Sequence, residues 1–188
     1  AGRGELVYYI GGEGEVLETA RPVLEASAKQ ILHIGAIGHA SALKVATNVI
    51  SATQIAALAE ALALLDRHEV DLSKLSLALE NNAARSGVIE MKLPGILAGD
   101  FEPRFSLKNM FKDIQIALAM AEEKDVELPA SSSFAGMAMA ALQRGWGEED
   151  FSVISRFYGY TGRMTETSES APEAEPVDQV EAALAPRR

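Results

Sequence analysis

The sequence predicts a mainly α protein, in which a helical domain around one long central helix follows a short strand–helix–strand segment. Three observations support this fold class. The residues from His39 to His68 are rich in Ala, Leu, Ile and Val and contain no proline, which is typical of a helix buried on most sides. Two short β-rich runs before this stretch each end at a glycine. Several helical patterns after it are separated by Pro and Gly.

The first segment has the order of one βαβ unit. Leu6–Ile10 and Gln30–Ile34 are the two expected strands, and they enclose apolar residues that recur at helical spacing: Val16, Ala20, Val23 and Leu24. The segment is about 30 residues long, which is the size of such a unit. Two strands alone leave unpaired sheet edges, so we expect Gly4–Gly35 to be the terminal part of a larger α/β sheet.

The long helix would span roughly 45 Å at about 1.5 Å per residue, so other helices must cover it. Further helical patterns supply them: Leu72–Ala84, Ser106–Glu123 and Ser132–Arg144. The expected breaks are Leu93-Pro94-Gly95, Glu102-Pro103, Leu128-Pro129 and Gly145-Trp146-Gly147. The pattern predicts one helical domain with the long helix at its centre.

We expect three parts along the chain: the end of an α/β domain at 1–36, the helical domain at 37–163 and a tail at 164–188. The tail is dominated by Glu, Ser, Thr, Pro and Ala, so we expect it to be acidic and disordered. The sequence starts at Ala1 without Met, and we expect the true N-terminus and any targeting signal to be absent.

The composition disfavours several function classes. The 188 residues, 48% of them hydrophobic, suffice for one domain with a real core plus attached pieces. A net charge of -10 disfavours nucleic-acid binding. The apolar stretch Gln54–Asp66 is interrupted by Glu60 and is too short for a membrane span, so we expect no membrane partner. With no cysteine and no histidine pair at metal-ligand spacing, we expect no metal site and a cytoplasmic location.

Lys44 and Asn48 are the strongest indication of chemistry. They lie four residues apart near the start of the long helix, so one helical face carries an amine and an amide. A sheltered Lys44 could exchange a proton with an alcohol, while Asn48 donates to a substrate oxygen or holds the amine. The alternative is that Lys44 projects into solvent and Asn48 has no specific partner. The spacing alone leaves both open.

A second segment, Asp100–Leu118, contains Phe105 and the pair Lys112-Asp113. Together with Gly35–Asn48, it resembles the β-hydroxyacid dehydrogenase family, which includes 3-hydroxyisobutyrate dehydrogenase, tartronate semialdehyde reductase and the glyoxylate/succinic semialdehyde reductases. In that family a Gly-x-x-Gly-x-Gly-x-x-x-Lys-x-x-Asn-Asn stretch precedes a Phe-x-x-x-x-x-x-Lys-Asp stretch. The order and the spacing match those of this sequence.

The resemblance implies a role for each matching residue. Lys44 matches the family's catalytic lysine, and Asn48 matches its substrate-binding asparagine. Lys112 matches a lysine that reaches toward the cofactor, and Phe105 lies where the family has an aromatic residue near the nicotinamide. Asp113 matches an acidic residue that we interpret as structural, holding the start of its helix.

The resemblance extends to both ends of the chain. Gly4–Gly35 resembles the end of the family's Rossmann-type nucleotide-binding domain, and Gly145–Ser152 resembles its last helical turn, so the likeness covers about 1–157. Two residues depart from the motif: its third glycine is Ala40 here, and its first asparagine is Thr47. Both departures alter the loop and the hydrogen bonds beside the expected site.

By resemblance, the reaction is hydride transfer between a β-hydroxy acid and NAD or NADP, with Lys44 exchanging the hydroxyl proton. The family's carboxylate anchor, a Ser-Gly-Gly loop, and its pyrophosphate cradle, a Gly-x-Gly-x-x-Gly turn, have no match in this chain. We expect the glycines of Gly11–Gly14 to form a simple turn. The chain is therefore expected to be the C-terminal part of such an enzyme and inactive alone.

Two alternatives remain open by resemblance: an imine reductase-like enzyme, and a non-catalytic oligomerisation module of the same fold. Both groups commonly lack the lysine, so Lys44 argues against them. The apolar helices His39–His68 and Leu107–Glu123 exceed what one thin domain can cover. The expected partners are therefore a second copy, in a homodimer or higher homo-oligomer, and a small hydroxy acid or semialdehyde as substrate.

Overall fold

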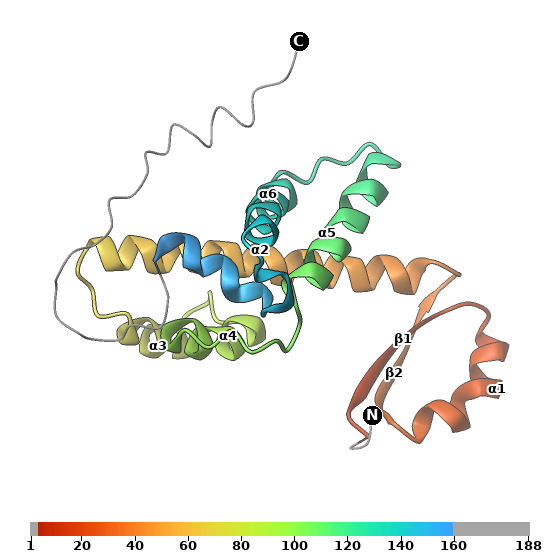
Figure 1. Ribbon diagram of the computed structural model, residues 1–188. Helices are drawn as coiled ribbons and strands as arrows, with labels where there is room; N and C mark the ends of the chain where they lie inside the picture. Colours follow the sequence, from red (N-terminus) through yellow and green to blue (C-terminus); the bar gives the residue numbers. More distant parts are fainter. Residues whose placement is uncertain (1–3, 160–188) are drawn as a thin grey trace, which may run out of the picture.

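The computed structural model describes residues 4–159, which form a mainly helical structure with a small parallel sheet (Figure 1). The mainly α prediction is confirmed. In chain order the elements are β1 (Leu6–Gly11), α1 (Gly14–Glu25), β2 (Ala28–Gly35), α2 (His39–Arg67), α3 (Ser73–Glu80), α4 (Gly87–Ala98), α5 (Leu107–Glu122), α6 (Pro129–Gln143) and the 3-10 helices η1 (Trp146–Glu148) and η2 (Phe151–Tyr158). The tail predicted at 164–188 lies outside the described residues.

The sheet segment has the predicted order of strand, helix and strand. β1 and β2 pair in parallel, with Tyr8 opposite Ile31. Gly11 ends β1 close to the residues that lead into α2. A Cβ atom at this position would lie 2.7 Å from the carbonyl oxygen of Ala36, so a larger residue would push the two segments apart.

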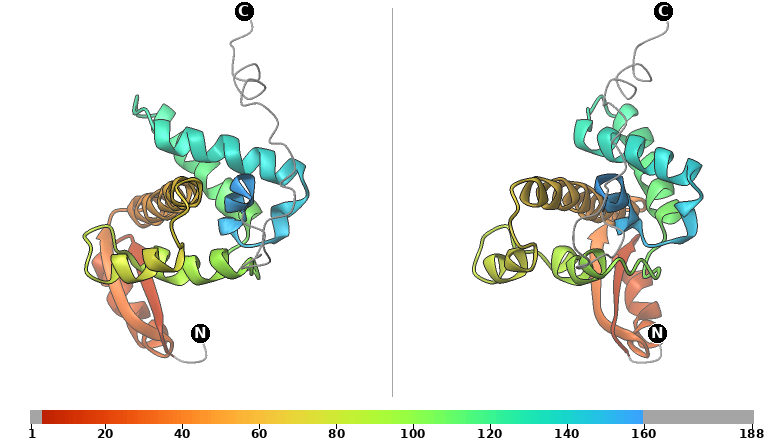
Figure 2. Two further views of the ribbon diagram at one scale, coloured as in Figure 1. Left: turned by 90° about the vertical axis from the view of Figure 1, so that its left-hand side faces the viewer. Right: turned by 60° about the vertical axis from the view of Figure 1, so that its left-hand side comes forward.

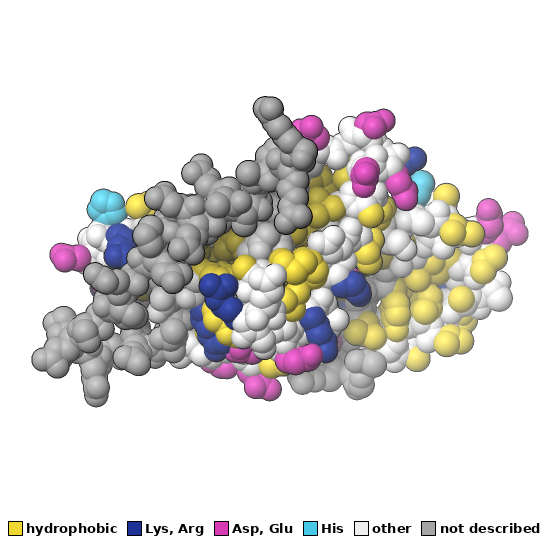
Figure 3. All heavy atoms as spheres, turned by 45° about the horizontal axis from the view of Figure 1, so that its top comes forward, with side chains coloured by type: hydrophobic (Ala, Val, Ile, Leu, Met, Phe, Trp, Pro, Cys, Tyr) yellow, Lys and Arg dark blue, Asp and Glu magenta, His cyan; other side chains and the backbone are white. Residues whose placement is uncertain are grey.

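The apolar residues of this segment are largely uncovered. In α1, Val16 and Val23 are 66% and 77% exposed, and Leu17 is the buried residue. β1 also exposes Leu6 and Val7. Figure 3 shows hydrophobic side chains gathered at the right of the view, where this segment lies. The helical spacing therefore predicted the helix correctly, but its apolar face is exposed.

α2 is the central helix, as predicted. Gly38 precedes it with a φ of 93°, in the left-handed region that favours glycine. Ile55 and Leu62 on α2 are completely buried, and the helix contacts α4, α5, α6 and η2. In Figure 2, α4 lies to one side of α2, and α5 and α6 lie to another. The other large core residues come from these elements: Ile96, Leu107, Met110, Ile114, Phe134, Val153 and Ile154.

α2 corrects one expectation from the sequence, that no stretch reaches the length of a membrane span. Among the described residues, this 29-residue helix is the one that is long and apolar enough to cross a membrane. Glu60 does not interrupt it, because a single charge leaves the surrounding window apolar. Length and composition are weak evidence, since the core helix of a soluble protein meets the same criteria.

α4 was missed because the residues Leu93-Pro94-Gly95 predicted a break, whereas they lie inside this helix. Its ends define it instead. Ser86 caps the start, its hydroxyl accepting a hydrogen bond from the Ile89 N–H at 3.3 Å. Gly99, with a φ of 65°, ends the helix in the left-handed conformation. Two other helices differ from the prediction at their ends: α3 stops at Glu80 and α6 starts at Pro129.

Candidate functional site

Lys44 and Asn48 contact each other directly on one face of α2. Lys44 Nζ donates a hydrogen bond to Asn48 Oδ1 at 2.5 Å. Asn48 is buried, with 6% of its surface exposed, and its Nδ2 donates to Asp113 Oδ2 on α5 at 2.5 Å. The two segments singled out in the sequence are therefore joined by hydrogen bonds that run from amine to amide to carboxylate.

Asp113 has a different role from the one inferred from the sequence. It was interpreted as holding the start of its helix, but it lies in the second turn of α5 and receives the Asn48 amide. Its other oxygen, Oδ1, lies 3.0 Å from Lys112 Nζ. The Asp113 side chain is 17% exposed, whereas that of Lys112 is 64% exposed. Asp113 thus links the Lys44–Asn48 pair to an exposed cation.

A cavity of about 280 Å³ adjoins this pair. It is lined by Lys44, Asn48 and Phe105, and Lys112 is not among its lining residues. Three of the four site residues predicted from the sequence therefore share one cavity, while Lys112 is connected to it through Asp113. Apolar and polar side chains from several elements complete the lining: Val88, Met91, Met110, Phe151, Ser51, Lys92 and Arg104.

Of the two positions that the spacing left open for Lys44, sheltered or exposed, residues 4–159 have the exposed one. Lys44 lies near the start of α2, and the buried residues of this helix begin only at Asn48. Of the two hydrogen-bonded residues, Asn48 is buried and Lys44 is exposed. The amine therefore faces a surface onto which a substrate or a further element could be placed.

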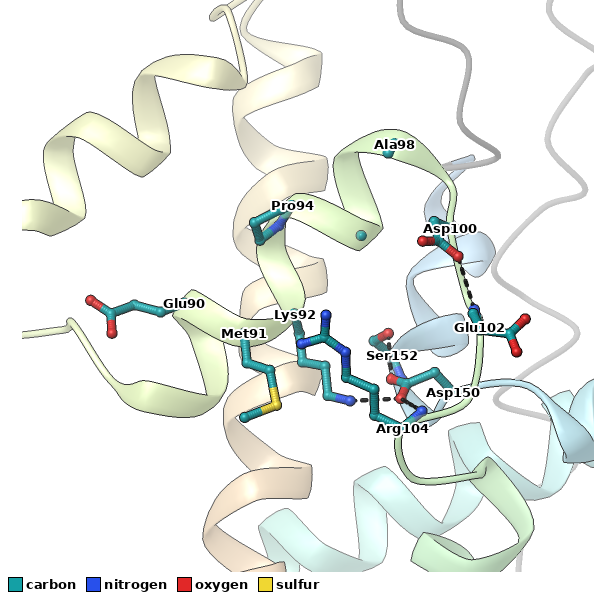
Figure 4. A pocket seen from close by; sticks show the side chains of 11 residues that line it. Glu90, Met91, Lys92, Pro94, Ala98, Asp100, Glu102, Arg104, Asp150 and Ser152 are labelled. Atoms are coloured by element: carbon teal, nitrogen blue, oxygen red, sulfur yellow. Dashed lines mark hydrogen bonds and ion pairs between the residues drawn. The ribbon is translucent and has the colours of Figure 1, made fainter. Parts of the chain in front are cut away.

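The site contains a second polar group that the sequence did not indicate, the pair Lys92 and Asp150. Lys92 Nζ lies 2.6 Å from Asp150 Oδ2, and the two side chains are 5% and 4% exposed (Figure 4). The Lys92 amine also lies 4.8 Å from the centre of the Phe151 ring. The sequence contained one indication of a buried charge, a single lysine between apolar residues. Because a break was expected at Pro94, the helix that directs Lys92 into the core was not predicted.

Asp150 also fixes the segment that carries Phe105. Its Oδ2 accepts hydrogen bonds from the backbone N–H groups of Arg104 and Phe105, at 3.1 and 3.3 Å. Its Oδ1 accepts from the N–H and the hydroxyl of Ser152. Burial raises the pKa of Asp150, but the hydrogen bonds from Lys92 and Ser152 lower it by more, so its pKa lies below the ordinary value.

A larger hollow, of about 490 Å³, lies beside the first cavity (Figure 4). The two share Met91, Lys92 and Arg104 in their linings. The larger hollow differs in charge, because Asp100 and Glu102 also line it. Within residues 4–159, no group of three or more His, Asp or Glu side chains is arranged to hold a metal ion.

Residues 38–158 match a family model described as the NAD-binding domain of NADP-dependent 3-hydroxyisobutyrate dehydrogenase. Among curated proteins, an L-threonate dehydrogenase from Cupriavidus necator is 32% identical over 84% of this chain and 54% of its own length. A cytokine-like nuclear factor N-PAC from Aedes aegypti is 30% identical over 82% of this chain and 28% of its own length.

Among solved structures, a 3-hydroxyisobutyrate dehydrogenase from Mycobacterium tuberculosis, determined with L-serine, superposes with a TM-score of 0.76 at 28% identity. The match covers 83% of this chain and 56% of that protein. The chain thus spans about half the length of these two dehydrogenases, and a smaller share of the nuclear factor.

Proposed function

This chain belongs to the family of the NAD-binding domain of NADP-dependent 3-hydroxyisobutyrate dehydrogenase, and on that premise we propose that it is the C-terminal part of an NAD(P)-dependent oxidoreductase. The proposed reaction interconverts a small β-hydroxy acid and its semialdehyde or keto form. One observation carries the proposal. Hydrogen bonds connect Lys44 to Asn48 and Asn48 to Asp113, and Lys44 and Asn48 line a cavity that Phe105 also lines.

In this proposal Lys44 is the general acid/base. The Lys44 side chain takes the proton of the substrate hydroxyl during oxidation and returns it during reduction. Asn48 holds Nζ through Oδ1, and Asp113 holds the Asn48 amide through Nδ2. Because the amide is bonded at both ends, it cannot turn without losing both hydrogen bonds, so the amine is kept within reach of the cavity. Bound NAD or NADP supplies the hydride acceptor or donor.

Phe105 and Lys112 are the residues that we propose contact the cofactor. Phe105 is half-buried in the cavity wall, and the exposed amine of Lys112 suits a cofactor that carries phosphates. The turn after β1 does not suit a pyrophosphate, because Glu13 places a carboxylate at the start of α1. Most cofactor contacts are therefore proposed to come from residues outside this chain. Calorimetry of this chain with NADPH should detect no binding, and micromolar affinity would contradict that expectation.

The sheet segment and the helical surface support two further proposals. Residues 1–36 are proposed to be the end of a Rossmann-type domain, because two strands with an uncovered apolar surface need further strands and helices. Residues 37–163 are proposed to form the helical domain of a homodimer or higher homo-oligomer. Exposed apolar residues on α2, α5 and α6 favour such an interface: Ile50, Ile116 and Met139. Light scattering that gives a monomer mass for the complete protein would exclude the oligomer.

The second candidate function is a non-catalytic oligomerisation module of the same fold. The exposure of Lys44 and the similarity to a protein named as a nuclear factor favour it. The retained Lys44–Asn48 hydrogen bond favours the enzyme instead, and Lys44 also argues against an imine reductase-like activity.

A turnover assay distinguishes the two functions. The complete protein should reduce NAD or NADP in the presence of at least one small β-hydroxy acid, measured by the absorbance of the reduced nicotinamide. If the protein is folded and oligomeric but turns over none of a panel of such acids with either cofactor, the proposed enzyme function is wrong. That result would support the non-catalytic oligomerisation module.

A further inference from the structure

Asp150 contacts the segment before α5 at both of its ends. The Asp150 N–H donates a hydrogen bond to the Phe101 carbonyl oxygen at 2.9 Å. Its Oδ2 accepts from the backbone N–H groups of Arg104 and Phe105, at 3.1 and 3.3 Å. The next residue, Phe151, donates its N–H to the Phe105 carbonyl oxygen at 3.0 Å. Because hydrogen bonds hold both the N–H and the carbonyl of Phe105, the backbone from which its ring projects is fixed.

The Phe105 ring is held as well as its backbone. It lies edge-on to the Phe151 ring, with the ring centres 6.4 Å apart, and both rings line the cavity of Lys44. The Lys92 amine lies 4.8 Å from the centre of the Phe151 ring and 2.6 Å from Asp150 Oδ2. Lys92 therefore contacts both groups that hold Phe105: the carboxylate that binds its backbone and the ring that packs against its side chain.

The Lys92–Asp150 pair supplies hydrogen bonds that apolar side chains of the same size could not. A buried ion pair contributes little net stability over an apolar replacement, and these two side chains are 5% and 4% exposed. An apolar side chain, however, cannot accept the N–H groups of Arg104 and Phe105, which share Asp150 Oδ2 with the Lys92 amine. The other oxygen, Oδ1, accepts from Ser152, so both ends of the carboxylate are held. What the pair adds over an apolar core is therefore the position of the segment that carries Phe105.

We propose that Asp150, held by Lys92, is a positioning residue for the reaction and sets where the Phe105 ring lies in the cavity wall. The inference rests on the proposed function, in which Phe105 contacts the cofactor. Asp150 and Lys92 act through Phe105, so their contribution to turnover depends on that ring being present. A displaced ring would change how the cofactor faces the substrate, and a misplacement of about 1 Å costs up to roughly 100-fold in rate.

The experiment removes the pair from the complete protein, with and without Phe105. The double variant Lys92→Met/Asp150→Leu takes away both charges together, so neither is left buried alone. It should lower kcat/KM for the cofactor about 10-fold or more when Phe105 is present. In a Phe105→Leu background the same double variant should lower it by less than about 2-fold, because the residue through which the pair acts is gone. A merely structural role would give equal falls in the two backgrounds.

Steady-state kinetics measure these values by varying NAD or NADP at a saturating concentration of the acid that the wild type oxidises, with 3-hydroxyisobutyrate tried first. The matched control is Lys108→Met/Glu148→Gln, which removes an ion pair whose two side chains are exposed. It should leave kcat/KM at the wild-type value. Thermal melting checks that each variant folds. If Lys92→Met/Asp150→Leu does not fold, Asp150→Asn, which keeps the side-chain volume, replaces it in both backgrounds with the same expected results.

Hydrogen exchange gives a readout that does not depend on turnover. Exchange at the Arg104 and Phe105 amides, measured by mass spectrometry, should be about 10-fold faster or more in Lys92→Met/Asp150→Leu and unchanged in the control. Unchanged exchange in the double variant would show that the pair does not hold the segment, and would overturn the inference. Equal falls of kcat/KM with and without Phe105, or no fall at all, would overturn it while the proposed function stands. If the wild type turns over no small β-hydroxy acid with NAD or NADP, the proposed function fails and the inference fails with it.

Discussion

Asn48 and Asp113 are 65 residues apart in sequence, yet the Asn48 amide donates to the Asp113 carboxylate at 2.5 Å and joins α2 to α5. The oxygen of the same amide accepts a hydrogen bond from the Lys44 amine. A buried amide with both ends bonded has one preferred orientation, since any rotation leaves a buried donor or acceptor unpaired. The position of Lys44 therefore depends on a residue of another helix.

Removing the Asp113 carboxylate should destabilise the fold. In Asp113→Ala the buried Nδ2 of Asn48 loses its acceptor, and the free energy of unfolding should fall by about 1–3 kcal/mol. Urea unfolding measures it. Glu123→Ala is the matched control, because this exposed residue follows the last turn of the same helix and its loss should change the free energy by less than about 0.5 kcal/mol. Equal effects of the two variants would mean that the Asn48–Asp113 hydrogen bond contributes nothing to stability.

Lys44 should control turnover. In the complete protein Lys44→Ala should lower kcat by roughly 100-fold or more, because the substrate hydroxyl loses its proton acceptor, while KM for the cofactor changes little. Steady-state kinetics with saturating cofactor measure both constants. Lys124→Met, an exposed lysine after α5, serves as the control and should retain wild-type kcat. Near-normal turnover of Lys44→Ala would remove the amine from the proposed mechanism.

The buried and exposed ion pairs of the chain should differ in their contribution to stability. Lys92→Met leaves a buried Asp150 without its cation and should lower the free energy of unfolding by about 3–5 kcal/mol. Lys108→Met breaks a comparable contact with Glu148, but both of those side chains are exposed, so the loss should stay below about 1 kcal/mol. Chemical denaturation compares the two, and a loss below 1 kcal/mol for Lys92→Met would exclude a structural role for the buried pair.

The lowered pKa of Asp150 predicts a loss of stability in acid. Below the pKa of an unfolded aspartate, about 3.9, the unfolded chain binds a proton that the folded Asp150 does not yet bind. The free energy of unfolding should therefore fall as the pH drops from about 4 toward the lowered pKa, and this contribution should be constant above that window. Asp150→Asn should flatten this acid limb in urea titrations at several pH values. An unchanged slope would assign the acid sensitivity to other carboxylates.

The sequence predicted those parts of the site that depend on a single helix. The spacing of Lys44 and Asn48 placed them on one face of α2, and the lack of proline over His39–His68 predicted that helix. The contact with Asp113 could not be predicted, because it depends on how α2 packs against α5. The same holds for Lys92, whose partner is 58 residues away. The sequence left open whether Lys44 is sheltered or exposed, because apolar composition does not reveal which end of a helix is covered.

Lys112 should act on cofactor binding and not on the chemical step. Its side chain is 64% exposed and its amine lies 3.0 Å from Asp113 Oδ1, so it is held near the site without lining the cavity of Lys44. In the complete protein Lys112→Met should raise KM for the cofactor by roughly 10-fold, through loss of one charged hydrogen bond, and leave kcat at saturating cofactor within about 3-fold. Lys108→Met removes another exposed lysine of α5 and should leave both constants unchanged. A fall in kcat at unchanged KM in Lys112→Met would show that this lysine supports the reacting groups through Asp113 and does not contact the cofactor.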